Sequence, residues 1–168
     1  MTELETLRHE KDDFFRSERQ SPLSAEQKQA FNGLNYYPEN HALRLELKLE
    51  RTTSSEPVTL ATSTGDEREY THVGQIRFMV NGEQAILQVY AADYGFFLPF
   101  LDATAPEETY GAGRYLEPEE SLPDLLHVDF NLAYNPYCAY NERWSCPLPP
   151  SANRLSVRIE AGEKRFHE

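Results

Sequence analysis

The chain has few of the residues that mark membrane, secreted or metal-binding proteins. Its 168 residues include two Cys, one Trp and two Met. No stretch approaches the roughly 20 apolar residues that a membrane-spanning helix needs. The first fifteen residues lack the basic start and apolar middle of a signal peptide. We therefore expect a cytoplasmic protein.

Positive charge is also scarce, with 16 Lys and Arg against 28 Asp and Glu and a formal net charge of -12. Such a chain repels phosphate backbones and anionic membrane surfaces, and no basic cluster offsets this field. Eight carboxylates and one base, Arg114, lie between residues 101 and 130. Nucleic acid and membranes are therefore poor partners. We expect no cofactor, and the sequence does not indicate an oligomeric state.

Aromatic residues make up for a modest aliphatic content, since the chain has ten Tyr and nine Phe. Each aromatic side chain can bury on the order of 150 to 250 Å². The length suits one domain. We expect a single domain over residues 1–168, with an N-terminal helical region (1–34) and a β domain with long loops rich in Pro, Tyr and Asn (41–168).

Two capping-box spacings predict the N-terminal helices. Thr2 is followed by Glu5, and Ser24 is followed by Gln27. In a capping box the first side chain bonds the backbone of the helix start and the second returns the bond. We predict a helix over residues 3–18 and a short one over residues 25–32 that ends at Gly33. Lys11 interrupts the apolar stripe of the first helix.

Strict alternation predicts antiparallel strands. Residues 41–50 place four leucines on one face (Leu43, Leu45, Leu47 and Leu49). Asn81-Gly82 is a strong signal for a two-residue hairpin turn. It pairs Phe78 with Ala85 and places residues 76, 78, 80, 85, 87 and 89 on one buried face.

Further strands are expected over 58–63, 70–80, 126–131 and 155–159, and over 96–100, where Pro99 requires an edge or a strand end. The predicted fold class is mainly β (α+β). It is an antiparallel sheet, sandwich or small barrel of about six to eight strands, with one or two N-terminal helices packed on it.

The segment 125–150 holds both cysteines, the single Trp and four Pro. Cys138 and Cys146 are separated by seven residues and could form a disulfide, although a cytoplasmic protein keeps its thiols reduced. A zinc site would need two more ligands. A nucleophilic Cys138 would need a base such as His127. The remaining alternative is two small buried thiols, and we predict no metal.

Two further groups of residues are candidates for ligand binding. His127, Asp129 and Asn131 alternate along one strand and would share a face, which is either a binding row or an ordinary solvated face. In the stretch Glu108–Tyr115, Gly111 and Gly113 precede Arg114, whose guanidinium could hold a carboxylate or phosphate of a ligand. The alternative for Arg114 is an exposed salt bridge with one of its acidic neighbours.

Several segments resemble a known family, the bacterial and archaeal proteins grouped as domain of unknown function 1684. They are Thr62–Gly65, FFLPFLDATAPEETYGAGRYL (96–116), VDFNLAYNPYCAYNERWSCPLPPSANRL (128–155) and Ile159–Lys164. The family often has Arg where Leu132 stands. The resemblance implies no reaction, cofactor or catalytic residue, because the family is uncharacterised. It implies that the two long motifs belong together, as one site or one packed structural unit.

Three functions remain open from the sequence. The first is a binding domain for a small polar or anionic organic ligand. The second is a hydrolase-like small-molecule enzyme that uses Cys138 or the carboxylates Asp129 and Glu163. The third is a structural domain without a ligand site. The candidate ligand-binding residues are Arg114, Tyr115, Asp129, Asn131, Asn135, Tyr137, Cys138, Cys146 and Glu163.

Overall fold

The computed structural model describes residues 1–167 and begins with two helices, α1 (Glu3–Ser17) and α2 (Ala25–Ala30). Both predicted capping boxes are confirmed, with Thr2 capping α1 and Ser24 capping α2. Gly33 follows α2 with a φ of 110°. Within the described residues, no helix combines the length and the apolar composition needed to cross a bilayer.

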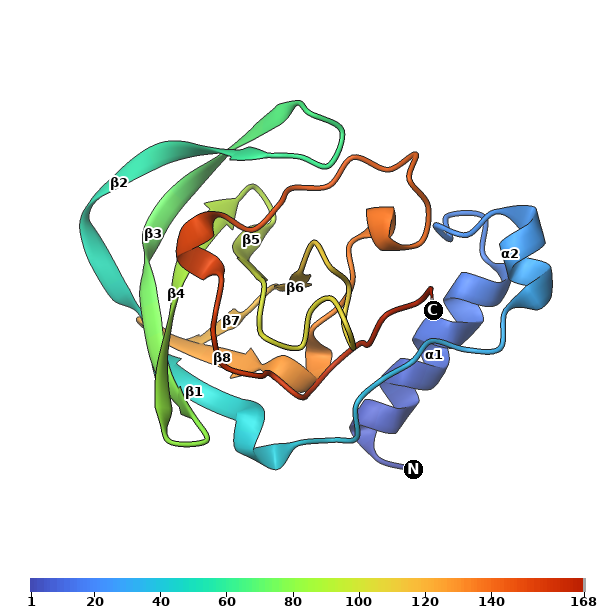
Figure 1. The fold of residues 1–168 in the computed structure, drawn as a ribbon. Helices are drawn as coiled ribbons and strands as arrows, with labels where there is room; N and C mark the ends of the chain where they lie inside the picture. The colour runs from blue at the N-terminus through green and yellow to red at the C-terminus, as the bar shows by residue number, and fades with distance from the viewer. Residues whose placement is uncertain (168) are drawn as a thin grey trace.

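Within residues 1–167, eight strands form two antiparallel sheets, in the orders β1-β8-β7 and β2-β3-β4-β5-β6 (Figure 1). The strands are β1 (Arg44–Lys48), β2 (Glu50–Ala61), β3 (Glu67–Val80), β4 (Glu83–Ala92), β5 (Gly95–Phe100), β6 (Arg114–Leu116), β7 (Glu119–Leu122) and β8 (Leu125–Asp129). The prediction of a mainly β, antiparallel fold is confirmed, with two sheets rather than a barrel.

The Asn81-Gly82 turn sets the register of the β3–β4 hairpin as predicted. Asn81 and Gly82 have φ values of 50° and 83°, and positive φ at both positions is what a type I′ turn requires. The predicted pairs are all present: Val80 with Glu83, Phe78 with Ala85, Ile76 with Leu87 and Gly74 with Val89.

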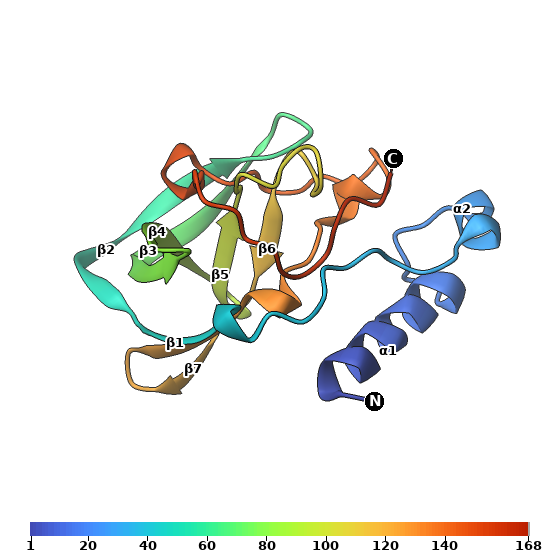
Figure 2. The same ribbon diagram turned by 60° about the horizontal axis from the view of Figure 1, so that its bottom comes forward.

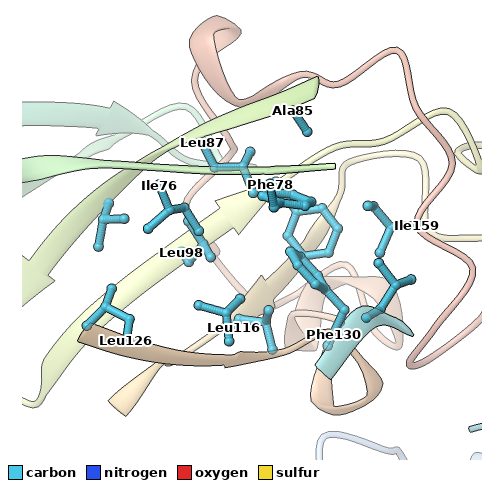
Figure 3. Packing of buried hydrophobic residues seen from close by; sticks show 14 of the residues in the cluster. Ile76, Phe78, Ala85, Leu87, Leu98, Leu116, Leu126, Phe130 and Ile159 are labelled. Carbon is cyan, nitrogen blue, oxygen red and sulfur yellow. The ribbon is translucent and has the colours of Figure 1, made fainter. Parts of the chain in front are cut away.

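The inner face of this hairpin packs against residues of the other sheet, so the two sheets share one core (Figure 3). Ile76 and Leu87 come from the hairpin, and Leu126 and Phe130 come from β8 and the turn after it; all four are fully buried or nearly so. The Phe78 and Phe130 rings meet with centroids 5.2 Å apart.

The leucines of residues 41–50 face this core, although the segment is two strands rather than one. Leu43 and Leu49 are buried, while Leu45 and Leu47 are partly buried against the same cluster. At Leu49 the chain leaves β1 of the small sheet and enters β2 of the large one. The Leu49 amide donates to the Asp124 carbonyl at 2.7 Å instead of to a β1 or β2 partner.

Strand β5 lies between β4 and β6, so the edge alternative for Pro99 is wrong and the strand-end alternative is correct. The pairing of β5 with β4 ends at Phe97, and β6 pairs on the other side over residues 98–100. Pro99 therefore lies beyond the part of β5 that pairs with β4. A missing backbone N–H costs no ladder hydrogen bond there.

The predicted strand over residues 155–159 is wrong as secondary structure, although its burial pattern is right. Val157 and Ile159 are buried and Leu155 is partly buried. The segment runs beside residues 101–103, with the Ala103 amide donating to Val157 at 2.9 Å. Beyond Val157 its backbone hydrogen bonds go to side chains of other segments, so no regular ladder forms there.

The two helices lie to one side of the sheets (Figures 1 and 2). Phe15 of α1, with Leu23 and Phe31, forms a separate apolar cluster with Tyr140. The Phe15 and Tyr140 rings meet edge-on with centroids 4.9 Å apart. The helices therefore attach to the β domain largely through the loop that carries Tyr140.

We predict that Gly162→Ala destabilises the protein much more than Gly65→Ala. Both glycines have positive φ, 82° and 93°, and Ala in that region costs roughly 1 to 2 kcal/mol. A Cβ at Gly162 would also lie 2.7 Å from the Ala133 carbonyl oxygen, whereas nothing lies within 4 Å of one at Gly65. Denaturant unfolding of both variants measures the difference, and equal losses would contradict the close approach.

Candidate functional site

Arg114 joins two of the family-like segments, 96–116 and 159–164. Its guanidinium donates to the carbonyls of Ile159 (2.9 Å), Ala161 (2.5 Å) and Glu163 (3.1 Å) and to the Asp102 carboxylate (3.3 Å). Asp102 in turn accepts the Ile159 amide at 2.7 Å. Arg114 thus holds the C-terminal segment by side-chain hydrogen bonds rather than by strand pairing.

Arg114 forms a salt bridge with an acidic neighbour, as one alternative expected, but the pair is buried rather than exposed. The Arg114 side chain is 1% exposed and that of Asp102 is 2% exposed. Burial lowers the pKa of Arg114, and the charge of Asp102 opposes this change. The Asp102 carboxylate is the anion that pairs with Arg114, a role that the sequence analysis considered for a ligand. Arg114 is therefore a clamp between parts of the chain.

Glu163 lies next to this clamp, and its carboxylate is 2% exposed. One carboxylate oxygen accepts from the Asn135 backbone amide (2.7 Å) and from the Lys11 ammonium of α1 (3.0 Å). The other accepts from the Tyr140 hydroxyl at 2.8 Å. The structure therefore brings together two predicted site residues, Asn135 and Glu163, with Lys11, whose interruption of the apolar stripe is explained by this contact.

His127 and Asp129 share one face of β8 and line the same two grooves, whereas Asn131 lies beyond the end of the strand. Asn131 lies in a short 3-10 helix after β8 and its side chain bonds both the backbone of Asn40 and the Asp129 carboxylate. Asp129 also pairs with Arg44 at 3.0 Å. His127 bonds Glu46 at 2.7 Å on the exposed side of the strand pair.

Three hollows meet at Leu132, and two of them lie between α1 and the β domain. Two are open grooves of about 400 and 310 Å³, and the third is a smaller hollow of about 70 Å³. The smallest hollow is lined by Arg8, Lys11, Tyr36 and Glu163, among others. Arg8 and Lys11 lie on α1, where their sequence pattern is that of ordinary solvated groups, and Tyr36 lies in the segment after α2, so the sequence does not single out these three as site residues.

Arg8 and Tyr36 together account for three of the five buried side-chain polar atoms without a partner within residues 1–167; the others are Arg114 Nε and Asn135 Oδ1. Arg8 donates one bond, from Nη1 to the Tyr37 carbonyl at 2.9 Å, and its guanidinium lies 4.4 Å from the Tyr36 ring centroid. Its Nε and Nη2, and the Tyr36 hydroxyl, are buried without a hydrogen-bond partner within residues 1–167. Burial lowers the pKa of Arg8 and raises that of Tyr36 well above its usual value.

A larger hollow of about 460 Å³ lies near the Asn81 turn, and its charged lining residues differ from those of the hollow at Arg8. Its cation, Arg158, already pairs with Glu108 and Glu160. This hollow therefore offers no unpaired charge to a ligand.

Cys138 and Cys146, both in the segment 125–150, lie close together. Both are free thiols, and the Cys138 backbone amide donates to the Cys146 sulfur at 3.3 Å. The Tyr110 hydroxyl donates to the Cys138 sulfur at 3.4 Å, while Tyr115 bonds the Pro147 carbonyl beside Cys146. Tyr137, in contrast, is partly exposed and packs on Trp144 with ring centroids 5.3 Å apart.

The two thiols have different acidities. A side-chain hydrogen bond with Cys146 is the largest cause that lowers the pKa of Cys138, to about 6, with burial opposing it. The same contact, together with burial, raises the pKa of Cys146 well above its usual value. No group of three or more His, Cys, Asp or Glu side chains suited to a metal occurs in the part of the chain that the structure describes.

We predict that Arg114→Met lowers the free energy of unfolding by about 3 to 5 kcal/mol, because it leaves the Asp102 carboxylate buried without its cation. Arg77→Met is the matched control, since it removes the exposed pair of Arg77 with Glu50 and should cost at most about 1 kcal/mol. Chemical denaturation measures both losses. Similar losses in the two variants would show that Arg114 is not a clamp.

Comparisons with known proteins agree with the resemblance found in the sequence. The chain is similar to an uncharacterised protein of Haloarcula marismortui, whose solution NMR structure matches with a TM-score of 0.74 at 39% identity, over 98% of this chain and 94% of that one. No curated protein matches the chain. A family model, "Protein of unknown function (DUF1684)", matches residues 29–164. Because these residues make up most of the chain, the protein belongs to this family.

Proposed function

We propose that the protein binds a small organic monoanion in the hollow beside α1, and that Arg8 receives its negative charge. The observation that carries this proposal is the pair of buried, unpartnered nitrogens of Arg8, beside the unpartnered Tyr36 hydroxyl, within residues 1–167. Buried polar groups of native proteins nearly always have a partner. A ligand carboxylate would supply one here.

The geometry of the guanidinium favours a carboxylate. Nη1 of Arg8 is used by the Tyr37 carbonyl. The remaining Nε and Nη2 are the two donors on one edge of the planar group, and such an edge bonds both oxygens of a carboxylate at once. The Tyr36 hydroxyl is a third group that can bond a ligand oxygen.

The charges around the hollow favour a single negative charge. Lys11 is paired with Glu163, and Arg44 is paired with Glu39 and Asp129, whereas Arg8 forms no ion pair within residues 1–167. The same three carboxylates lie close enough to Arg8 to act on its pKa. They would repel a dianion more strongly than a monoanion, because Coulomb energy scales with charge.

The shape and lining favour an anion with an apolar body. The hollow at Arg8, about 70 Å³, has room for a carboxylate and little more. It adjoins the larger grooves at Leu132, which is 44% exposed, and Leu7 of α1 is 46% exposed there. Apolar side chains beside one charged anchor are typical of small-molecule sites.

The contacts of Asp129 and Glu163 favour binding over catalysis by these carboxylates. Glu163 accepts three hydrogen bonds from Lys11, Asn135 and Tyr140, so its oxygens already have partners. Asp129 is similarly held by Arg44 and Asn131. A general base needs an oxygen within hydrogen-bond reach of the substrate proton.

Butyrate and benzoate should raise the thermal unfolding temperature of the wild-type protein, and butyramide at the same concentration should not. At a concentration 100 times its Kd, a ligand adds about 2.7 kcal/mol to stability. In Arg8→Met, which keeps much of the stem's packing, the stabilisation by butyrate should disappear.

Arg19→Met is the matched control, because Arg19 is exposed and its replacement removes the same charge. It should keep the full response to butyrate. Equal responses of the Arg8→Met and wild-type proteins, or no response of the wild type to any carboxylate, would overturn the proposal.

A further inference from the structure

We propose that Cys138 and Cys146 form a redox-active dithiol that reduces a small hydroperoxide, with Cys138 as the attacking sulfur and Cys146 as the resolving one. This site is separate from the hollow beside α1. The inference rests on the contact between the two cysteines, on the groups that hold each sulfur, and on the restricted access to the pair.

The two cysteines are held by different parts of the fold. Cys138 lies in a short 3-10 helix, Tyr137–Ala139. Cys146 is hydrogen-bonded to Ser63 in the turn between β2 and β3. The Cys146 backbone amide donates to the Ser63 hydroxyl at 3.1 Å, and the Cys146 carbonyl accepts from the Ser63 backbone amide at 2.9 Å. The backbone nitrogen of Cys138 is 3.3 Å from the Cys146 sulfur. A disulfide between them would therefore need only a local adjustment of the loop.

The surroundings favour a thiolate at Cys138 and a thiol at Cys146. The Tyr110 hydroxyl donates to the Cys138 sulfur, and the contact with Cys146 shifts the two pKa values in opposite directions. The lowered pKa of Cys138 favours its thiolate near neutral pH. The thiolate is the reactive form, so the two sulfurs have distinct roles.

The reaction balances with a hydroperoxide as the oxidant. The Cys138 thiolate attacks the terminal oxygen, the O–O bond breaks, and the leaving oxygen takes a proton from solvent to give water or an alcohol. Cys138 is then a sulfenic acid. The Cys146 sulfur displaces its hydroxyl group, which leaves as water with the Cys146 proton, and an S–S bond forms. Two electrons pass from the thiols to the hydroperoxide.

Access to the sulfurs favours a small oxidant. Cys138 and Cys146 are 8% and 7% exposed, so each reaches solvent over a small area. The partly buried rings of Tyr110 and Trp144 pack against the cluster that contains both cysteines. Hydrogen peroxide fits this access better than a bulky lipid hydroperoxide.

The test uses the full chain and hydrogen peroxide. After exposure and alkylation of the unfolded protein, mass spectrometry should count two free thiols in the untreated wild type and none in the oxidised one. Cys146→Ser should give a sulfenic acid at Cys138 that dimedone traps. Cys138→Ser should lose the reaction by at least tenfold. Circular dichroism confirms that both variants fold.

A second measurement assigns the attacking sulfur without any cysteine substitution. The alkylation rate of Cys138 in the folded wild type should rise with a midpoint near pH 6, and at pH 7 Cys138 should react at least tenfold faster than Cys146. Tyr110→Phe should move the midpoint upward, because it removes one hydrogen bond to the thiolate. Two thiols that survive the peroxide, dimedone at Cys146, or a midpoint at pH 8 or above would overturn the proposal.

Discussion

The buried Arg114 guanidinium is the group on which the C-terminal part of the candidate site depends. Through three carbonyls of residues 159–163 it fixes the segment that carries Glu163, and therefore the floor of the hollow beside α1. The next residue of β6, Tyr115, reaches the Pro147 carbonyl next to Cys146. Burying the ion pair of Arg114 and Asp102 away from water is costly, and the hydrogen bonds from Arg114 to the three carbonyls offset that cost. The short strand β6 thus fixes the segment that carries Glu163 through Arg114 and contacts the residue next to Cys146 through Tyr115.

Local patterns were sufficient for much of the fold. The capping boxes depend on residues three apart, and the hairpin register depends on a two-residue turn and the alternation beside it, so the sequence predicts both. Strands β6 and β7 are too short to show a period. Residues 155–159 alternate like a strand, yet the partners of Ile159 are the side chains of Asp102 and Arg114. Contacts at a separation of more than 40 residues leave no local pattern.

The candidate site was predictable only where residue type singled it out. The two cysteines and the Asn-rich and Tyr-rich loop stand out by composition, and the structure places Asn135, Glu163, Cys138 and Cys146 in contact networks. Arg8 and Tyr36 do not stand out, because whether an arginine is paired depends on tertiary packing. Arg114 was misjudged for the same reason: a base in an acidic stretch suggests an exposed ion pair. Its burial follows from side-chain contacts with Asp102 and with the carbonyls of residues 159–163, which no local pattern reveals.

The ion pair of Lys11 with Glu163 joins residues 152 positions apart and has a consequence for synthesis. A ribosome makes a chain from its N-terminus at about 5 to 20 residues per second. The partners of α1, Tyr140 and Glu163, therefore emerge several seconds after the helix itself. The helix must remain without these contacts during that time. The order of translation thus places closure of the hollow beside α1 after the synthesis of residue 163.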